Sequence, residues 1–518
     1  MNTWLFALVT IMIIGMPFAL AIGVRRWKPT KWLYFIGGVL TFLGALVIHL
    51  LLNELMGRIG ILPTGDLSGS DLIQAALLLG LSAAVSEELA RVIGYRILTK
   101  ARSIGDGLMM GLGHGGIEAI IVAVLFAAGI SALSNFDRTN LLPTGSSAEE
   151  YSTLELQLDQ IEQSSLIALA PLAERAIALG AQVTFSVLIL AAFRTRRWIY
   201  VLIAITYHTV VDAAAIISAA ELDNPWLVEL VLFLVVLPGL IWLFRQLTKD
   251  HTKNPTRTVQ WQVNLAVFWA SLRKELQFQW RTRRILIVLA VFLVFGMLSP
   301  IIAKFTPQLI SSLEEAAAFA ELIPDPSVID AINQYMSNLT QFGFILVILL
   351  GMTAVAGEKE KGTAAMVLSK PVPRWIFVTA KFVAQGMAYL LAITLAGLAA
   401  YYYTDFIFDG LSFSGFMLAN LLLYLWLMVF SAVTLMGSSI GRSTAVAAGI
   451  SLAGGILLII LGALPRYGQL FPSGLVGWAT AASLNLEGVA NGGAAALALG
   501  LILLFLTASV SALEEQEI

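Results

Sequence analysis

The sequence predicts an all-α, polytopic membrane protein with about 13 transmembrane helices. Of its 518 residues, 58% are apolar and only 12% are charged, whereas an average soluble domain contains about 25% charged residues. Apolar stretches of about 20 to 30 residues recur from end to end, and this is the length that an α-helix needs to cross a bilayer. The chain is therefore expected to lie in a lipid bilayer, as a multi-pass protein of the cell membrane.

Seven apolar stretches precede a polar segment at 246–258, and six follow it. They begin near Trp4, Trp32, Asp71, Asp106, Leu166, Trp198 and Trp226, and then near Ile285, Leu339, Trp375, Phe413, Thr444 and Ala494. The polar segment is interrupted by Pro255, which is typical of a linker. We therefore predict a seven-helix domain at 1–245, a cytoplasmic linker at 246–258 and a six-helix domain at 259–518.

The six-helix domain begins with an amphipathic segment. Its apolar residues Trp269, Leu272 and Trp280 alternate with basic residues at helical spacing, so the segment is expected to lie flat on the inner membrane surface. A soluble helix is the alternative, because amphipathicity alone does not separate the two. Near the other end of this domain, the external stretch 465–488 is expected to be a packed loop rather than short interfacial helices.

The charges of the loops predict the orientation of the chain. Lys and Arg residues gather in alternate loops, and the intervening loops are acidic. The acidic residues of the first external loop of the second domain are Glu314, Glu315, Glu321, Asp325 and Asp330. By the positive-inside rule, the N-terminus lies outside and the C-terminus in the cytoplasm. The first apolar stretch carries its positive charges after it, which favours a spanning helix over a cleaved signal.

Composition also excludes several kinds of site. The chain has no cysteine, so it has no disulfide, no thiolate zinc site and no cysteine nucleophile. Its formal net charge is −2, and nothing in the sequence indicates a nucleic-acid partner.

Polar motifs interrupt three apolar stretches of the first domain: SEELAR (86–91), GHGGIEA (113–119) and YHTVVDA (207–213). Counting 1.5 Å per helical residue from the cytoplasmic ends places Glu87, His114 and His208 at depths of about 13 to 18 Å. Three helices therefore present a carboxylate and two imidazoles in one layer. Ionisable groups in a membrane are costly, so each of them needs a partner or a task.

The spacing inside these motifs supports an acid–base function. Residues i and i+4 share a helix face, and the pairs at this spacing are Glu87 with Arg91, His114 with Glu118, and His208 with Asp212. A glutamate beside Glu88 and Arg91 can act as a general base. His114 is suited to positioning a water molecule, and His208 to donating a hydrogen bond to an oxyanion. Peptide hydrolysis by a carboxylate-activated water fits these groups.

Other interpretations of the polar residues remain open. A buried charge network is favoured for a single pair such as Glu174 with Arg175, and His49 with Asn53 suits a structural or substrate-gating role as well as a chemical one. Glu, His and Asp are also suitable zinc ligands, although the HExxH spacing is absent. Clusters of this kind also serve as proton relays.

The three motifs resemble the YhfC family of glutamic-type intramembrane proteases, which are related to the CAAX prenyl endopeptidases and bacteriocin-processing enzymes. The resemblance covers about residues 1–245. It implies that Glu87 and His114 activate the water, that His208 and Asp212 stabilise the oxyanion, and that Glu88 and Arg91 support them. We expect no metal ion or other cofactor to be bound directly by this chain, with zinc as the alternative. The CAAX enzymes commonly have Asn at the position of Asp212.

The second domain resembles the type-2 permeases of ABC exporters. The resemblance is carried by the surface helix, the six spans, and the segment GEKEKGTAAMVLSKPVPR (357–374). It implies that this segment contacts an ATP-binding subunit, through the charged residues Glu358, Lys359, Glu360 and Lys361. Gly357 and Gly362 are spaced as in a phosphate-binding loop, but Thr363 replaces the required lysine, so no ATP site is expected in this chain. The domain would pair with a second permease copy.

Three functions are compatible with the sequence. The chain could cleave a peptide or protein substrate and be joined to an export permease, or it could be a permease with an inactive first domain. A signalling or immunity protein that uses neither activity is the third.

Overall fold

The structure is a computed structural model that describes residues 3–63, 67–134, 165–253, 265–311, 325–408, 410–465, 467–486 and 490–516. In these ranges every regular element is helical and no strand occurs. The described residues include 13 helices that are long and apolar enough to cross a membrane. The predicted all-α membrane fold and its number of spans are therefore confirmed.

The chain divides into two compact units. The first comprises 1–127 and 138–262, and the second 128–137 and 263–518. Among the described residues, the helices of the first unit are α1 (Thr3–Trp27), α2 (Trp32–Arg58), α3 (Gly69–Ile97), α4 (Ile104–Ser134, of which 128–134 are counted with the second unit), the 3-10 helix η1 (Ser165–Leu169), α6 (Ala170–Thr195), α7 (Ile199–Glu221) and α8 (Pro225–Lys253).

In the part of the second unit that the structure describes, there are six spans and several shorter helices. In chain order its helices are α9 (Leu265–Arg281), α10 (Arg284–Ser311), α12 (Val328–Gly351), α13 (Ala356–Glu360), α14 (Thr363–Leu368), α15 (Arg374–Phe408), α16 (Phe413–Ile440), α17 (Thr444–Gly462), η2 (Gly468–Leu470), α18 (Ser473–Ser483) and α19 (Gly492–Glu514).

Helix α12 begins earlier than the sequence predicts. It starts at Val328, whereas hydropathy placed the start of this span near Leu339. Its first turns contain polar residues, which lower the local hydropathy without breaking the helix. Asp330, which was expected in the external loop, instead forms a capping box with Ser327 at the start of the helix.

Helix α8 continues to Lys253, so residues 246–253 of the predicted linker are helical, and 254–258 lie outside the described residues. The predicted domain bounds stay a prediction. One further expectation needs correction. The stretch 465–488 contains α18 rather than only a packed loop. Of the acidic residues predicted in the external loop, Glu314, Glu315 and Glu321 lie outside the described residues.

In the first unit, a close approach of α2 to α4 positions the polar layer. A Cβ atom at Gly38 would lie 2.1 Å from the Met110 carbonyl oxygen and 2.7 Å from the His114 nitrogen. Small residues allow membrane helices to pack backbone against backbone in this way. The glycine therefore determines how close His114 comes to α2.

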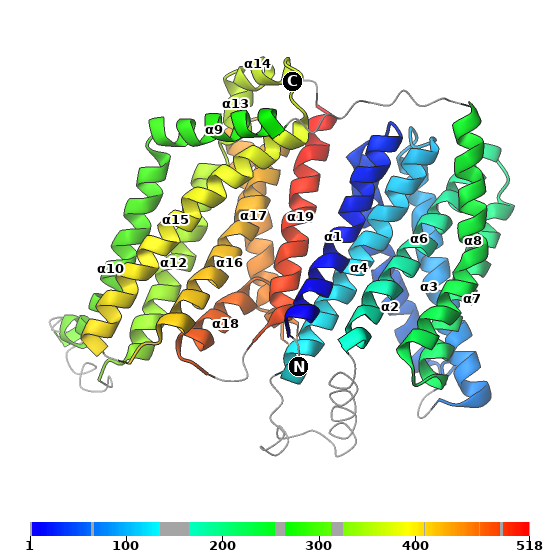
Figure 1. Cartoon of the computed structure of the whole chain (residues 1–518), viewed down its shortest axis with the longest axis horizontal. Coiled ribbons are helices and arrows are strands. Elements are labelled where there is room, and N and C mark those ends of the chain that lie inside the picture. Colours follow the sequence, from blue (N-terminus) through cyan, green and yellow to red (C-terminus); the bar gives the residue numbers. More distant parts are fainter. Residues whose placement is uncertain are drawn as a thin grey trace. The chain divides into compact units, whose positions relative to one another are not determined.

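In the second unit, α16 lies at the centre and packs against α12, α15, α17, α18 and α19. The core of this unit is rich in aromatic side chains, including Phe292, Tyr389 and Phe430. Helix α9 runs across the ends of the membrane helices, on the side where α13 and α14 are found (Figure 1). Its Trp269 and Trp280 are exposed, as in a helix that lies at a membrane interface.

Candidate functional site

Three helices of the first unit bring one carboxylate and two imidazoles together. Glu87 of α3 places Oε2 2.9 Å from Nε2 of His114 on α4. The same oxygen is 3.9 Å from Nε2 of His208 on α7. All three residues are buried. The layer predicted from helix depths is therefore present in the structure, with Glu87 between the two histidines.

The orientation of His114 is set by Thr41 of α2. The Thr41 hydroxyl donates to the carbonyl oxygen of Gly38 at 2.7 Å, and it lies 3.0 Å from Nδ1 of His114. Because a hydroxyl has a single proton, its oxygen accepts from His114 Nδ1–H. Nε2 of His114 and Oε2 of Glu87 lie 2.9 Å apart, and a hydrogen bond between them requires one proton on either atom. The pair is thus arranged to hold and to transfer one proton.

A second carboxylate holds the other histidine. Glu88 Oε1 is 2.9 Å from Nδ1 of His208 and also accepts from Arg91. Arg91 lies 3.4 Å from Glu87, and Asp212 Oδ2 lies 3.4 Å from Nε2 of His208. The pairs Glu87 with Arg91 and His208 with Asp212, expected at i,i+4 spacing, are thus formed. Both Glu88 and Arg91 are fully buried, so each supplies the counter-charge that the other requires.

Gln182 of α6 joins these groups and was not singled out from the sequence. Its Oε1 accepts from Arg91. Its Nε2 donates to Glu118 at 2.7 Å and to Glu87 at 3.3 Å. The side chain is buried. A glutamine inside an apolar span was the available signal, but an uncharged residue does not stand out beside charged motifs.

Glu118 has a different partner from the one expected. It is not hydrogen-bonded to His114 in the described part of the chain. Instead Glu118 accepts from Arg175 at 3.0 Å, and Arg175 also pairs with Glu174. The reason is that Arg175 of α6 offers a full positive charge, whereas His114 is already occupied by Thr41 and Glu87. The pair on α6 is therefore connected to the polar layer.

A cavity of about 90 Å³ adjoins this layer. Its wall includes Asp212, His208, Glu118 and Arg175 together with apolar side chains of α6, α7 and α8. The Asp212 side chain is 31% exposed, while that of His208 is 2% exposed. The cavity therefore leaves room for a small chemical group beside His208 and Asp212.

His49 and Asn53 of α2 lie beside the site rather than in it. Both are half-buried, and Asn53 Oδ1 accepts from Ser82 of α3 at 2.5 Å. Within the described residues, no hydrogen bond joins His49 to Glu87, His114 or His208. Asn53 thus links α2 to α3, and a gating role for either residue stays a prediction.

In the second unit, three of the four charged residues predicted to face an ATP-binding subunit are bonded within the chain. Glu358 Oε1 accepts from Lys381 at 2.8 Å. Lys359 donates to the Ser439 carbonyl oxygen at 2.6 Å, and Glu360 caps α17 at Thr444. Lys361 is exposed. These contacts fix α13 to the membrane helices.

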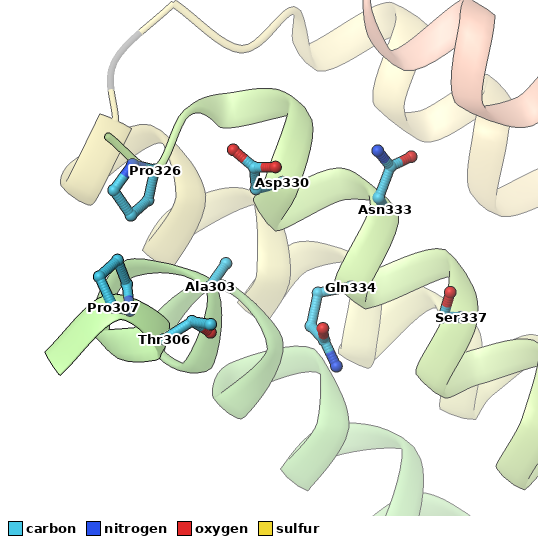
Figure 2. A pocket seen from close by; sticks show the side chains of 8 residues that line it. All are labelled: Ala303, Thr306, Pro307, Pro326, Asp330, Asn333, Gln334 and Ser337. Carbon is cyan, nitrogen blue, oxygen red and sulfur yellow. The ribbon is translucent and has the colours of Figure 1, made fainter. Parts of the chain in front are cut away.

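A polar cavity of about 320 Å³ lies between α10 and α12. Figure 2 shows that residues of α12, including Asp330, Asn333 and Gln334, line one side, and that Ala303, Thr306 and Pro307 of α10 line the other. Gln334 donates to Asn338 at 3.3 Å, deeper along α12. Hydrogen-bonding side chains therefore occur inside a span of the second unit, although no cluster of acid–base groups accompanies them among the residues described there.

The N-terminal and C-terminal parts of the chain match two different protein families. Residues 11–232 match the family model of the YhfC intramembrane metalloprotease. Residues 269–472 match the model of the ABC-2 family transporter protein.

Three curated proteins are similar to parts of the chain. The uncharacterized transmembrane protein YxlG of Bacillus subtilis is 27% identical over 218 residues, which cover 40% of this chain and 80% of that protein. The uncharacterized membrane protein YhfC of the same organism is 25% identical over 243 residues, covering 45% and 92%. The probable ABC transporter permease protein NosY of Pseudomonas aeruginosa is 32% identical over 133 residues, covering 26% and 43%. The chain therefore carries a YhfC-family domain in its N-terminal part and an ABC-2-family transporter domain in its C-terminal part.

Proposed function

We propose that the N-terminal domain hydrolyses a peptide bond within the membrane, using a water molecule activated by Glu87. The observation that carries this proposal is the position of Glu87 Oε2 between His114 and His208, at 2.9 and 3.9 Å from their Nε2 atoms. A buried carboxylate with a proton-transferring neighbour is what a general base requires. The match to a family of intramembrane proteases supports the same reaction class.

The proposed reaction assigns each residue a step. Glu87 takes a proton from water, and the oxygen of that water attacks the carbonyl carbon of the peptide bond. His208, held by Glu88 and lying beside Asp212, donates a hydrogen bond to the oxyanion that forms. The proton held between Glu87 and His114 then passes to the leaving nitrogen as the C–N bond breaks. The products are a carboxylate and an amine.

The description of the matching family raises the question of a metal ion. Among the described residues, no three His, Asp or Glu side chains are arranged to hold one. The 2.9 Å contact between Glu87 and His114 is a hydrogen-bond distance, and His208 Nδ1 is bonded to Glu88. The residues as placed fit a hydrogen-bonded acid–base site, and no step of the proposed reaction passes through a metal.

For the C-terminal domain we propose export in partnership with a separate ATP-binding subunit and a second permease copy. The support is the ABC-2 family match and the similarity to a probable ABC transporter permease. The cytoplasmic placement of α13 and α14 follows from the positive-inside rule. Co-purification of an ATP-binding protein with the full chain tests this partnership, and its absence in native lipid would argue against it.

The hydrolase is tested by incubating the purified chain in detergent with a proteome-derived peptide mixture. New peptide termini are expected with the parent protein and are expected to be lost with Glu87→Gln and His114→Ala. Glu54→Gln is the matched control, because Glu54 is exposed on α2 and pairs only with Arg58 among the described residues. Cleavage that is equal in all variants would leave the transport-only alternative, with an inactive N-terminal domain.

A further inference from the structure

A buried lysine in the second unit joins three helices through one nitrogen. Lys381 of α15 is 2% exposed. Its Nζ donates to Oε1 of Glu275 on α9 at 2.9 Å and to Oε1 of Glu358 on α13 at 2.8 Å. An ammonium group has three protons and no acceptor, so it can hold both carboxylates at once. The surface helix and the short cytoplasmic helix therefore meet at this side chain.

A second lysine completes the cluster from the outside. Lys274 Nζ lies 3.0 Å from Glu275 and 3.2 Å from Glu358, but its side chain is 45% exposed. Two positive and two negative groups balance each other, which makes burial of the cluster tolerable. Burial by itself raises the pKa of the Glu275 carboxyl, but the charges of Lys381 and Lys274 outweigh it and hold that pKa below its ordinary value.

Apolar packing alone does not fix α9 to the bundle. Its buried residues are Leu272, Glu275 and Gln279, so only one of the three is apolar. Trp269 and Trp280 are exposed, at 63% and 62%. Phe268 and Leu276 are half-buried, so α9 is attached both by apolar side chains and by the contact of Glu275 with Lys381.

Helix α13 is held on its other side as well. Lys359 donates to the carbonyl oxygens of Ser439, in the last turn of α16, and of Gly441, which follows that helix, at 2.6 and 3.2 Å. Glu360 bonds the Thr444 amide at 2.8 Å. A force applied to α13 is thus passed to α17 on one side and, through Glu358, to Lys381 on the other.

We propose that Lys381 is a positioning residue that holds α9 and α13 as one rigid body, so that displacement of α13 carries α9 with it. The inference rests on the proposed function in one respect, namely that an ATP-binding subunit supplies the displacement. The contacts of Lys381 with Glu275 and Glu358 lie within this chain and do not depend on that subunit. It gives the amphipathic helix a mechanical role in addition to membrane contact.

The absence of cysteine allows a direct test with two introduced labels. Gln277→Cys on α9 and Lys361→Cys after α13 are both at exposed positions. Spin labels there report the distance between the two helices in the full chain in lipid nanodiscs. The parent should give one narrow distribution of distances between the labels. Lys381→Met should give a broader distribution, although it still elutes as a folded, monodisperse protein. Lys370→Met, at an exposed position, is the control and should match the parent.

Exchanging the charges distinguishes a specific loss of the link between α9 and α13 from a general loss of stability. The double variant Lys381→Glu with Glu275→Lys keeps the balance of the cluster and lets the lysine on α9 reach both carboxylates. It should restore the narrow distribution. A distribution for Lys381→Met that equals the parent's, or a double variant that stays as broad as Lys381→Met, would overturn the proposal.

The complex with a co-purified ATP-binding subunit extends the test. With ATP and vanadate, the distance from α9 to α13 should stay constant in the parent and should change in Lys381→Met. If nucleotide moves neither helix relative to a label on α16 in the parent, the proposed partnership fails. The nucleotide-free comparison still decides the role of Lys381 in that case.

Discussion

Glu87 Oε2 and His114 Nε2 lie 2.9 Å apart, and both side chains are buried. Thr41 occupies the other nitrogen of the same imidazole. Both ring nitrogens of His114 therefore have a partner, and the imidazole is held with Nε2 facing Glu87. Substitutions that remove one of these contacts should change hydrolysis or stability, and the same holds for the ion-pair cluster of the second unit.

Replacement of Thr41 by valine should slow hydrolysis while the chain remains folded. The change keeps the shape of the side chain but removes the oxygen that accepts from His114 Nδ1–H. A hydrogen bond of this kind contributes about 0.5–1.5 kcal/mol, so a rate loss of up to about tenfold is expected. Thr41→Ser keeps the hydroxyl and should retain most of the rate. Initial cleavage rates of the two variants in the peptide-mixture assay decide this, and equal rates would show that Thr41 does not orient the histidine.

Replacement of Gln182 by leucine should destabilise the first unit as well as slow the reaction. The variant leaves Arg91, Glu87 and Glu118 each without one polar partner, and an unsatisfied buried group costs about 1–3 kcal/mol. A lower midpoint of thermal unfolding is expected in detergent. Gln277→Leu, at an exposed position of α9, is the matched control. An unchanged midpoint for Gln182→Leu would contradict the contacts described for this residue.

Much of this site follows from the sequence, and the remainder does not, for identifiable reasons. Glu87, His114 and His208 were found because charged residues at equal depth in apolar helices are rare and their depth is set by helical rise. Thr41 and Gln182 were missed because uncharged polar residues are common in membrane helices. The pairing of Glu118 with Arg175 was missed because the rotation of α4 against α6 is set by packing. In the second unit, the spans follow from hydropathy, but the contact of Lys381 with Glu275 joins residues 106 positions apart.

A methyl group at Gly38 should separate α2 from α4. The Cβ of Gly38→Ala would lie 2.1 Å from the Met110 carbonyl oxygen, and overpacking of this kind costs typically about 1–3 kcal/mol. Lower thermal stability and lower cleavage rate are expected together, because Thr41 moves with α2. Gly44→Ala on the same helix meets nothing within 4 Å and should behave like the parent. Equal unfolding midpoints for the two alanine variants would exclude a close approach at Gly38.

The ion-pair cluster on α9 should make stability depend on acid pH. The pKa of Glu275 is held below its ordinary value of 4.5, so the unfolded chain binds the proton more tightly than the folded chain does. The stabilisation is therefore fully present above the ordinary pKa and is lost as the pH falls through the folded pKa. The unfolding midpoint of Glu275→Gln should lie below that of the parent at neutral pH, and the difference should shrink below about pH 4.5. A difference that is independent of pH would contradict the charge pairing.

The most direct test of the proposed hydrolase follows the oxygen of the attacking water. The purified chain is incubated with the peptide mixture in water enriched in ¹⁸O, and new C-termini are read by mass spectrometry. We predict new C-termini that carry the heavy oxygen with the parent protein and with Glu54→Gln, and none with Glu87→Gln. The same labelled termini at the same rate from Glu87→Gln would show that Glu87 does not activate the water and would contradict the proposed function.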